Sequence, residues 1–204
     1  MKTGHAGAAR CVTGVTQDDA LDVTVREALA CRVCAEWLPL GPRPVFQVSR
    51  TTRILINGQA PGTKAHITGI PFNDTSGERL RTWLQLEPEQ FYDASRVAIV
   101  PMGLCYPGVM PNGGDAPPRP ECAPLWLDRF MRLMPEVRLT LLVGSYAQQR
   151  RLGRGGMAER VRRFREFGPA VIPLPHPSWR TKTWELRNPW FAAELLPVLR
   201  AAVR

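Results

Sequence analysis

The chain has 204 residues, enough for one domain with its own hydrophobic core, and 44% of them are hydrophobic, which excludes an intrinsically disordered protein. Its 27 Lys and Arg residues outnumber 18 Asp and Glu residues and give a net charge of +9, which favours a polyanionic partner such as DNA. No apolar run is long enough to span a bilayer or to act as a secretory signal, so we expect a cytoplasmic monomer with no membrane partner.

The predicted elements alternate between helices and strands. Residues 1–20 are expected to form a loose arm, and residues 21–204 a single domain that opens with a helix over residues 22–36. Apolar runs predict four strands, at Arg53–Asn57, Arg96–Val100, Arg138–Val143 and Ala170–Leu174. Helical patterns lie at 77–86, 122–134, 145–151, 157–167 and 189–203, the last beginning with a Pro suited to a first turn. The alternation predicts an α/β fold, a parallel sheet covered by helices on both faces.

Each predicted strand ends in an elaborate loop. The first runs into "NGQAPGTKAHITGIPFND", far longer than the roughly 2–6 residues that such a link usually needs. The carboxyl ends of parallel strands meet at one edge of the sheet, where ligands bind in folds of this class. The loops therefore predict a binding site at that edge.

Two loops carry residues suited to chemistry. Gly58 and Gly62 flank a rigid segment in which a backbone amide could approach a ligand, although the spacing is not a dinucleotide fingerprint. His176, held in a Pro-rich turn after the fourth strand, could donate a hydrogen bond to a developing anion. Each motif alone is a weak signal, because a loop His is usually structural.

The cysteines suggest a metal site. In a cytoplasmic protein, structural disulfides are not expected. Four thiolates could hold a [4Fe–4S] cluster or a zinc ion, and a lone Cys-x-x-Cys could also be a redox pair. The candidates are Cys31, Cys34, Cys105 and Cys122, with Cys11 left over.

Taken together, "GQAPG", "TGIPFNDTSG" and "HPS" resemble the uracil-DNA glycosylase superfamily over residues 25–200. The resemblance implies a three-layer α/β/α fold around a four-stranded parallel sheet, and hydrolysis of the N-glycosidic bond of uracil in DNA during base excision repair. The first loop and the cysteine pattern are most similar to the iron–sulfur branch of bacteria and archaea. The matching cysteines would then hold a [4Fe–4S] cluster: Cys31, Cys34, Cys105 and Cys122.

The resemblance also implies roles for single residues. Phe72 matches the aromatic on which the flipped base stacks, and His176 matches the residue that hydrogen-bonds uracil O2. The first loop would line the pocket and hold water near the sugar C1′, through Gly58, Ala60, Pro61 and Gly62. The loop of Ser178 would enter the minor groove, with Trp179 or Arg180 as a wedge. Phe72 and Trp179 could instead be simple packing residues.

The chain departs from the family at three positions. Ala60 stands where the best-known members carry Asp, and Pro101 stands where members usually carry Asn. Gln59, where the iron–sulfur branch often has an acid, could orient water but not accept its proton. Asp74 and Asn73 are candidate substitutes, although Asp74 also reads as a helix cap. The chain is therefore predicted to be an active glycosylase or, alternatively, a cluster-bearing protein of this fold that binds DNA without cleaving the bond.

The basic residues concentrate late in the chain. Arginines crowd the stretch "QQRRLGRGGMAERVRRFREF". If this segment meets DNA phosphates, replacing Arg162 and Arg163 together would weaken binding whatever the DNA sequence.

Overall fold

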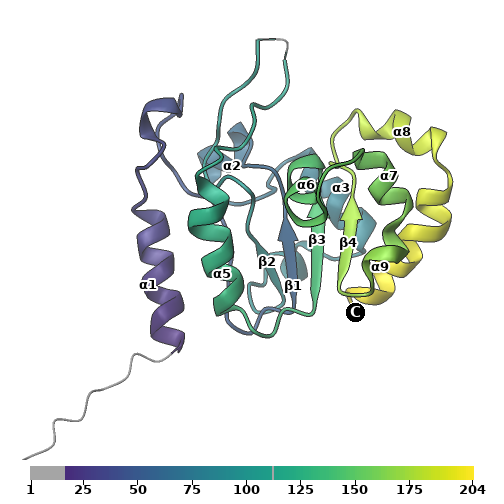
Figure 1. Ribbon diagram of the computed structural model, residues 1–204, viewed down its shortest axis with the longest axis horizontal. Helices are drawn as coiled ribbons and strands as arrows, with labels where there is room; N and C mark the ends of the chain where they lie inside the picture. Colours follow the sequence, from purple (N-terminus) through teal and green to yellow (C-terminus); the bar gives the residue numbers. More distant parts are fainter. Residues whose placement is uncertain (1–16, 112) are drawn as a thin grey trace, which may run out of the picture.

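A four-stranded parallel sheet forms the centre of the computed structural model, which describes residues 17–111 and 113–204 (Figure 1). The strands are β1 (Ile54–Asn57), β2 (Val97–Ile99), β3 (Leu139–Val143) and β4 (Val171–Leu174), in the order β2-β1-β3-β4. All three pairings are parallel, with Ile54 of β1 opposite Val97 of β2 and Leu139 of β3. The predicted α/β fold is confirmed. Each strand begins one residue later than predicted, and β2 also ends one residue earlier.

The strands bury side chains on both faces of the sheet, as parallel strands do. Ile54 and Ile56 belong to one hydrophobic cluster, whereas Leu55, between them, belongs to the other. The first cluster includes Trp83 and Phe191, on the side of helices α3 (Thr75–Leu84) and α9 (Leu196–Ala202). The second includes Phe130, on the side of helices α1 (Gln17–Leu29) and α5 (Asp128–Leu133). Figure 1 shows the same three layers, with α1 and α5 on one side and α3 and α9 on the other.

Most helices lie where the hydrophobic periodicity predicts them. The helices that correspond to predicted patterns are α3 (Thr75–Leu84), α5 (Asp128–Leu133), α6 (Ser145–Leu152), α7 (Met157–Arg162) and α9 (Leu196–Ala202). π-Helical segments lead into α5 and α9, at Ala123–Leu127 and Phe191–Leu195, and a 3-10 turn follows α7 at Phe164–Phe167. Three helices were not predicted: α2 (Thr63–Thr68), α4 (Pro88–Phe91) and α8 (Thr181–Arg187). All three are short and lie inside stretches that look like loops.

The prediction for the first helix is wrong. Helix α1 spans Gln17–Leu29, so it begins five residues earlier than predicted and ends before both cysteines. Cys31 and Cys34 lie in the turn that follows, where Cys34 leads into a 3-10 turn at Ala35–Trp37. The last four residues of the predicted arm therefore belong to α1, and the rest of it, with Cys11, lies outside the described residues.

The segment before β1 covers the free edge of β2. Gln47 exchanges two backbone hydrogen bonds with Ile99, at 2.9 and 2.8 Å, and its side-chain amide donates to the Val97 carbonyl at 2.7 Å. Val45 donates to the Leu104 carbonyl at 2.7 Å. An edge strand that is covered in this way does not offer its amides to another chain.

In the part of the chain that the structure describes, no helix has the length and apolarity needed to cross a membrane.

The loop between β2 and α5 projects beyond the carboxyl edge of the sheet (Figure 1). We call residues 108–111 and 113–116 of this loop the finger. Ala116 donates to the Gly108 carbonyl and Met110 to the Gly114 carbonyl, each at 2.9 Å, and Val109 and Asp115 form an antiparallel bridge. The finger is therefore a narrow hairpin that rises from the same edge as the predicted site.

Candidate functional site

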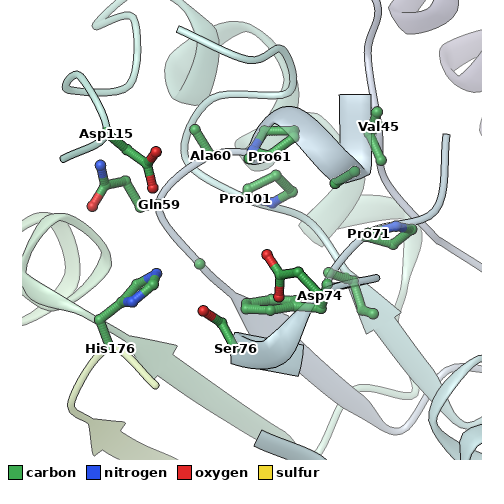
Figure 2. A pocket seen from close by; sticks show the side chains of 15 residues that line it. Val45, Gln59, Ala60, Pro61, Pro71, Asp74, Ser76, Pro101, Asp115 and His176 are labelled. Atoms are coloured by element: carbon green, nitrogen blue, oxygen red, sulfur yellow. The ribbon is translucent and has the colours of Figure 1, made fainter. Parts of the chain in front are cut away.

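A pocket opens at the carboxyl edge of the sheet, where the sequence predicts a site. It is formed by the loop after β1, the start of α3, the loop after β2 and the turn after β4 (Figure 2). Of the residues singled out from the sequence, those in its lining are Gly58, Gln59, Ala60, Pro61, Gly62, Phe72, Asp74, Pro101 and His176. Residues from three loops and the start of α3, up to 118 positions apart in the sequence, therefore form one cavity.

Phe72 is held rigidly at one wall of the pocket. Its backbone has φ = 53°, in the left-handed region that a bulky residue rarely adopts. The Tyr92 hydroxyl donates to its carbonyl at 3.1 Å, and its ring packs edge-on against Phe91. A Cβ on Gly58 would lie 3.2 Å from the ring, so this glycine allows the close approach. Strained backbone that its surroundings hold in place is typical of functional sites.

Gly77, in the first turn of α3, makes the position of Phe72 possible. A Cβ on Gly77 would lie 1.7 Å from the Phe72 carbonyl oxygen and 2.9 Å from its Cβ. We therefore expect Gly77→Ala to displace Phe72 and to lower the free energy of unfolding by about 1–3 kcal/mol, although Ala ordinarily favours a helix. Thermal or urea denaturation measures the loss. Gly156→Ala is the matched control, since its Cβ would meet Glu159 at an ordinary 3.7 Å; equal effects at the two sites would contradict this account.

His176 faces the pocket from the turn after β4. Its carbonyl accepts hydrogen bonds from the Thr181 hydroxyl and, at 2.8 Å, from the Ser178 amide. Its ring lies beside Gly144, where a Cβ would make an ordinary contact at 3.6 Å and the backbone φ of 89° favours glycine. Burial lowers the pKa of His176, and the charges of Asp115 and Asp74 oppose this only in part. The imidazole is therefore neutral at pH 7 and can donate one hydrogen bond without carrying a charge.

Asp74 is both a helix cap and a pocket residue. Its Oδ1 accepts the Gly77 amide at 2.9 Å, so the predicted N-cap of α3 is confirmed. Its Oδ2 lies 3.7 Å from where a Cβ on Gly62 would be, across the pocket from the first loop. One oxygen thus serves the helix, and the other faces the cavity (Figure 2).

The Gln59 side chain also has a structural task. Its amide nitrogen donates to the Ala116 carbonyl at 3.1 Å, and its backbone carbonyl accepts the Gly103 amide at 2.9 Å. Gln59 lines the pocket, but in Figure 2 its amide turns away from the centre of the cavity. It joins the first loop to the finger.

Four predicted binding residues lie outside the pocket lining. Asn73 donates to the Thr68 hydroxyl at 3.3 Å. Ser178 is half-buried beside His176, and Trp179 is 74% exposed with the Arg180 guanidinium 5.1 Å from its ring centroid. Trp179 does not pack on the terminal helix, so the simple packing role considered for it is wrong.

Sequence reasoning missed Asp115. This residue stands in the finger, 14 positions after Pro101, yet it lines the pocket near His176. In Figure 2 it lies beside Gln59, on the same side of the cavity as His176, with Asp74 and Ser76 opposite. The sequence shows only an acid in a long loop after a strand. It does not show that this part of the loop returns to the pocket.

The four candidate cysteines line a second, apolar pocket. Cys31 and Cys34 reach it from the turn after α1, Cys105 from the loop after β2, and Cys122 from the start of the π-helical segment before α5. The Leu104 amide donates to the Cys122 sulfur at 3.2 Å. All four are free thiols. The sequence therefore correctly predicts that these cysteines share one place in the fold.

Two of the four thiols have strongly raised pKa values. Burial raises the pKa of Cys105 to about 11 and that of Cys122 to about 12, and the neighbouring cysteines add to both shifts. Within residues 17–111 and 113–204, no three His, Cys, Asp or Glu side chains form a group positioned to hold a metal ion. The cysteines thus surround one pocket without converging on a single point.

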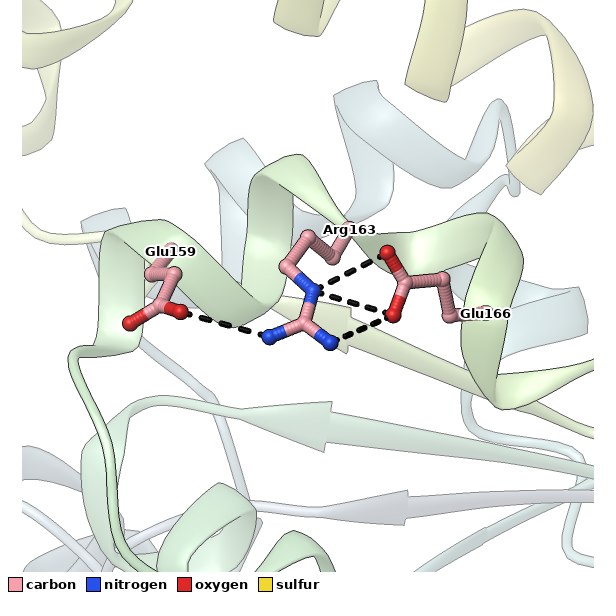
Figure 3. Close-up of polar contacts among 3 residues, drawn as sticks. All are labelled: Glu159, Arg163 and Glu166. Atoms are coloured by element: carbon pink, nitrogen blue, oxygen red, sulfur yellow. Dashed lines mark hydrogen bonds and ion pairs between the residues drawn. The ribbon is translucent and has the colours of Figure 1, made fainter.

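The late basic segment is partly neutralised by carboxylates of the same chain. Arg163 bonds to Glu166 through two nitrogens, at 2.9 and 2.6 Å, and to Glu159 at 3.3 Å (Figure 3). Arg162 and Arg165 both pair with Glu194, at 3.1 and 3.0 Å. A guanidinium that faces a carboxylate of its own chain offers less charge to a DNA phosphate. The crowding of arginines in the sequence therefore overstates how much free positive charge the segment presents.

One comparison with known protein families gives a match. The family model described as the uracil DNA glycosylase superfamily matches residues 45–200, well over half of the chain. The match includes the whole lining of the first pocket. It begins after Cys31 and Cys34, so it does not bear on the set of four cysteines.

Proposed function

Because this chain belongs to the uracil DNA glycosylase superfamily, we propose that it is a DNA glycosylase that hydrolyses the N-glycosidic bond of uracil or another deaminated base in base excision repair. One observation carries the proposal: Phe72 and His176 line the same pocket at the edge of the sheet. A flat aromatic wall and a neutral hydrogen-bond donor are what a flipped base needs for stacking and for charge stabilisation.

The reaction follows from these contacts. The target nucleotide leaves the duplex, and its base stacks on the Phe72 ring. As the bond between C1′ and the base nitrogen breaks, its electron pair moves onto the base. The neutral His176 imidazole donates a hydrogen bond to that growing charge, and this interaction is stronger in the transition state than in the ground state. A water molecule adds its oxygen to C1′ and loses a proton, which leaves an abasic site and the free base.

The second candidate function is DNA binding without cleavage. Ala60 and Pro101 both line the pocket, so the two departures from the family alter the cavity itself. A methyl group cannot orient water, and a proline ring without an N–H cannot read the edge of a base. These two positions are the specific observation that favours this alternative.

One assay separates the two functions. Purified protein is incubated with oligonucleotides that carry uracil, hypoxanthine, xanthine or a thymine mismatch, and abasic sites are scored by alkaline cleavage. The glycosylase proposal expects cleavage at one or more of these bases. DNA binding with no abasic site at any base would replace it with the second function.

We also propose a [4Fe–4S] cluster bound by Cys31, Cys34, Cys105 and Cys122. Four thiols that line one apolar pocket supply the complete ligand set of such a cluster. A single zinc ion needs its four sulfurs about 2.3 Å from one point, and the present arrangement around a pocket suits a larger group better. The amide of Leu104 would donate to a ligand sulfur, as is usual around such clusters. The cluster would cross-link the turn after α1 to the loop after β2.

The DNA-binding surface should lie around the pocket rather than on the late basic segment. Arg180 is exposed next to the pocket turn and forms no ion pair within the described residues, whereas Arg163 faces two carboxylates. We expect Arg180→Ala to weaken binding to a lesion-free duplex and to reduce the slope of log affinity against log salt by about 1. Arg163→Ala is the matched control and should leave the slope unchanged. Fluorescence anisotropy over a salt series measures both; the reverse ranking would refute this placement.

A further inference from the structure

The finger brings an acid into the pocket, although the family position for an acid is occupied by Ala60. Asp115 lines the cavity with Ala60 and His176. Its negative charge raises the pKa of His176 and so opposes the effect of burial. Asp115 contributes more to this than Asp74 does. The segment from Gly58 to Gly62 thus lacks a carboxylate, and the finger provides one near His176 (Figure 2).

Asp115 is positioned by contacts at both ends of the finger. The next residue, Ala116, accepts the Gln59 side-chain amide through its carbonyl at 3.1 Å and donates to Gly108 at 2.9 Å. Gly108 lies against Pro39, since a Cβ there would be 3.1 Å from the proline ring. The bridge between Val109 and Asp115 fixes the second strand of the hairpin against the first. Asp115 therefore stands at the anchored base of the finger.

The two carboxylates of the pocket differ in what else they do. Asp74 already uses Oδ1 to cap α3, which restrains its rotation. Within the described residues, the Asp115 side chain has no hydrogen bond and no ion pair, so both of its oxygens are available. A base that accepts a proton from water needs a free lone pair within hydrogen-bond reach of that water.

Resting on the proposed function, we propose that Asp115 is the catalytic carboxylate of the hydrolysis and that Gln59 is the residue that positions it. Asp115 orients the water that attacks C1′ and accepts its proton, while the electron pair of the breaking bond goes to the base that His176 stabilises. The proton then passes from Asp115 through solvent to the departing base anion, so the reaction consumes one water and yields the abasic site and the neutral base. A negative carboxylate also stabilises the positive charge that develops on the sugar.

The test uses single-turnover kinetics on the base that the parent protein excises fastest. Asp115→Asn keeps the size of the side chain and removes its charge and its ability to accept a proton, so the rate should fall about 10²-fold or more, with duplex affinity unchanged. Asp22→Asn, on the exposed face of α1, is the matched control for charge and should keep the parental rate. Melting temperatures check that each variant is folded.

Chemical rescue distinguishes a reacting carboxylate from a structural one. Asp115→Ala should recover part of its rate in added formate, because formate can occupy the space of the lost carboxylate and accept the proton. His176→Ala should not respond to formate. Gln59→Leu should lower the rate by a smaller factor, without rescue, because Asp115 is still present but less well oriented.

The outcomes are distinguishable from failure of the proposed function. A parental rate in Asp115→Asn, together with a strong loss in His176→Ala, would overturn the role of Asp115 and leave the glycosylase intact. Loss of rate in Asp115→Ala that formate does not restore would also count against the proton-accepting role. A parent protein that releases no base at all would overturn the glycosylase, and with it this inference.

Discussion

Replacing His176 with alanine is expected to lower the rate of base release roughly 10²–10³-fold, the usual cost of removing one donor to a developing oxyanion. The hydrogen bond from His176 strengthens as charge accumulates on the departing base. Its loss should therefore appear in the rate of the chemical step and hardly at all in DNA affinity. Single-turnover rates and binding isotherms on the same oligonucleotide measure the two quantities separately.

The pH dependence gives an independent check on the state of His176. Because burial lowers its pKa below the ordinary value of 6.5, the imidazole stays neutral through that range, and activity should not change near pH 6.5 on account of this residue. The same shift affects stability. The unfolded chain takes up a proton before the folded one does, so the contribution of His176 to stability is complete above about pH 6.5 and is lost as the pH falls below it.

The Asp74→Asn variant belongs beside His176→Ala. Asparagine is as good an N-cap as aspartate, so this change keeps the bond to the Gly77 amide and removes only the charge that faces the pocket. Unchanged melting with a lower rate would assign Asp74 an electrostatic role in the reaction. A parental rate would show that Asp74 serves only as the helix cap.

A His176→Ala protein that releases every tested base as fast as the parent would refute the assignment of the pocket.

Replacing Cys122 with serine is expected to abolish the iron–sulfur cluster and to leave the protein poorly soluble. Binding of a structural metal group contributes directly to folding, since the unfolded chain has no preformed site. The Cys122 sulfur also accepts the Leu104 amide, so the change would disturb the loop that leads into the finger. Anaerobic purification, iron and sulfide analysis and the visible absorption spectrum measure the result.

Cys11→Ser is the matched control for the cysteine prediction. Cys11 lies outside the residues that the structure describes and outside the set of four, so its replacement should leave iron content unchanged. A colourless parent protein with one zinc per chain would contradict the cluster. Because burial raises the pKa of Cys105 to about 11 and that of Cys122 to about 12, loading must displace protons from these thiols. Cluster assembly in vitro should therefore be favoured by raising the pH.

The sequence predicts the sheet well because each strand is a short, fully buried run. Ile54, Leu55 and Ile56 are all nearly inaccessible to solvent, and such runs stand out in any loop-rich sequence. The first helix was misplaced for the opposite reason. Its apolar pattern is weak, and the two cysteines looked like helical residues although they belong to the turn that follows. Short helices such as α2 and α8 escaped detection because tertiary contacts, rather than periodicity, define them.

The site could be predicted only as far as local motifs extend. Phe72, His176 and the glycine loop were recognised because each belongs to a contiguous pattern. Asp115 and Gly77 were not, because their importance depends on contacts across the fold: the base of the finger reaches the pocket, and the Phe72 carbonyl lies against Gly77 of α3. For the basic segment, the sequence suggests more free positive charge than the structure shows. Arg162 and Arg165 pair with Glu194, which is about thirty positions away and is not counted among the charges of the segment.

The two ends of the loop that carries the finger lie close together. The Leu104 amide bonds to the Cys122 sulfur at 3.2 Å, and a Cβ on Gly103 would lie 3.0 Å from Pro118. For a loop with fixed ends, doubling the length costs only about 0.6 kcal/mol. Changes of length within the finger, between Gly108 and Ala116, should therefore cost the rest of the domain little stability. The finger is the part of this edge where we expect chain length to vary most freely while the sheet stays the same.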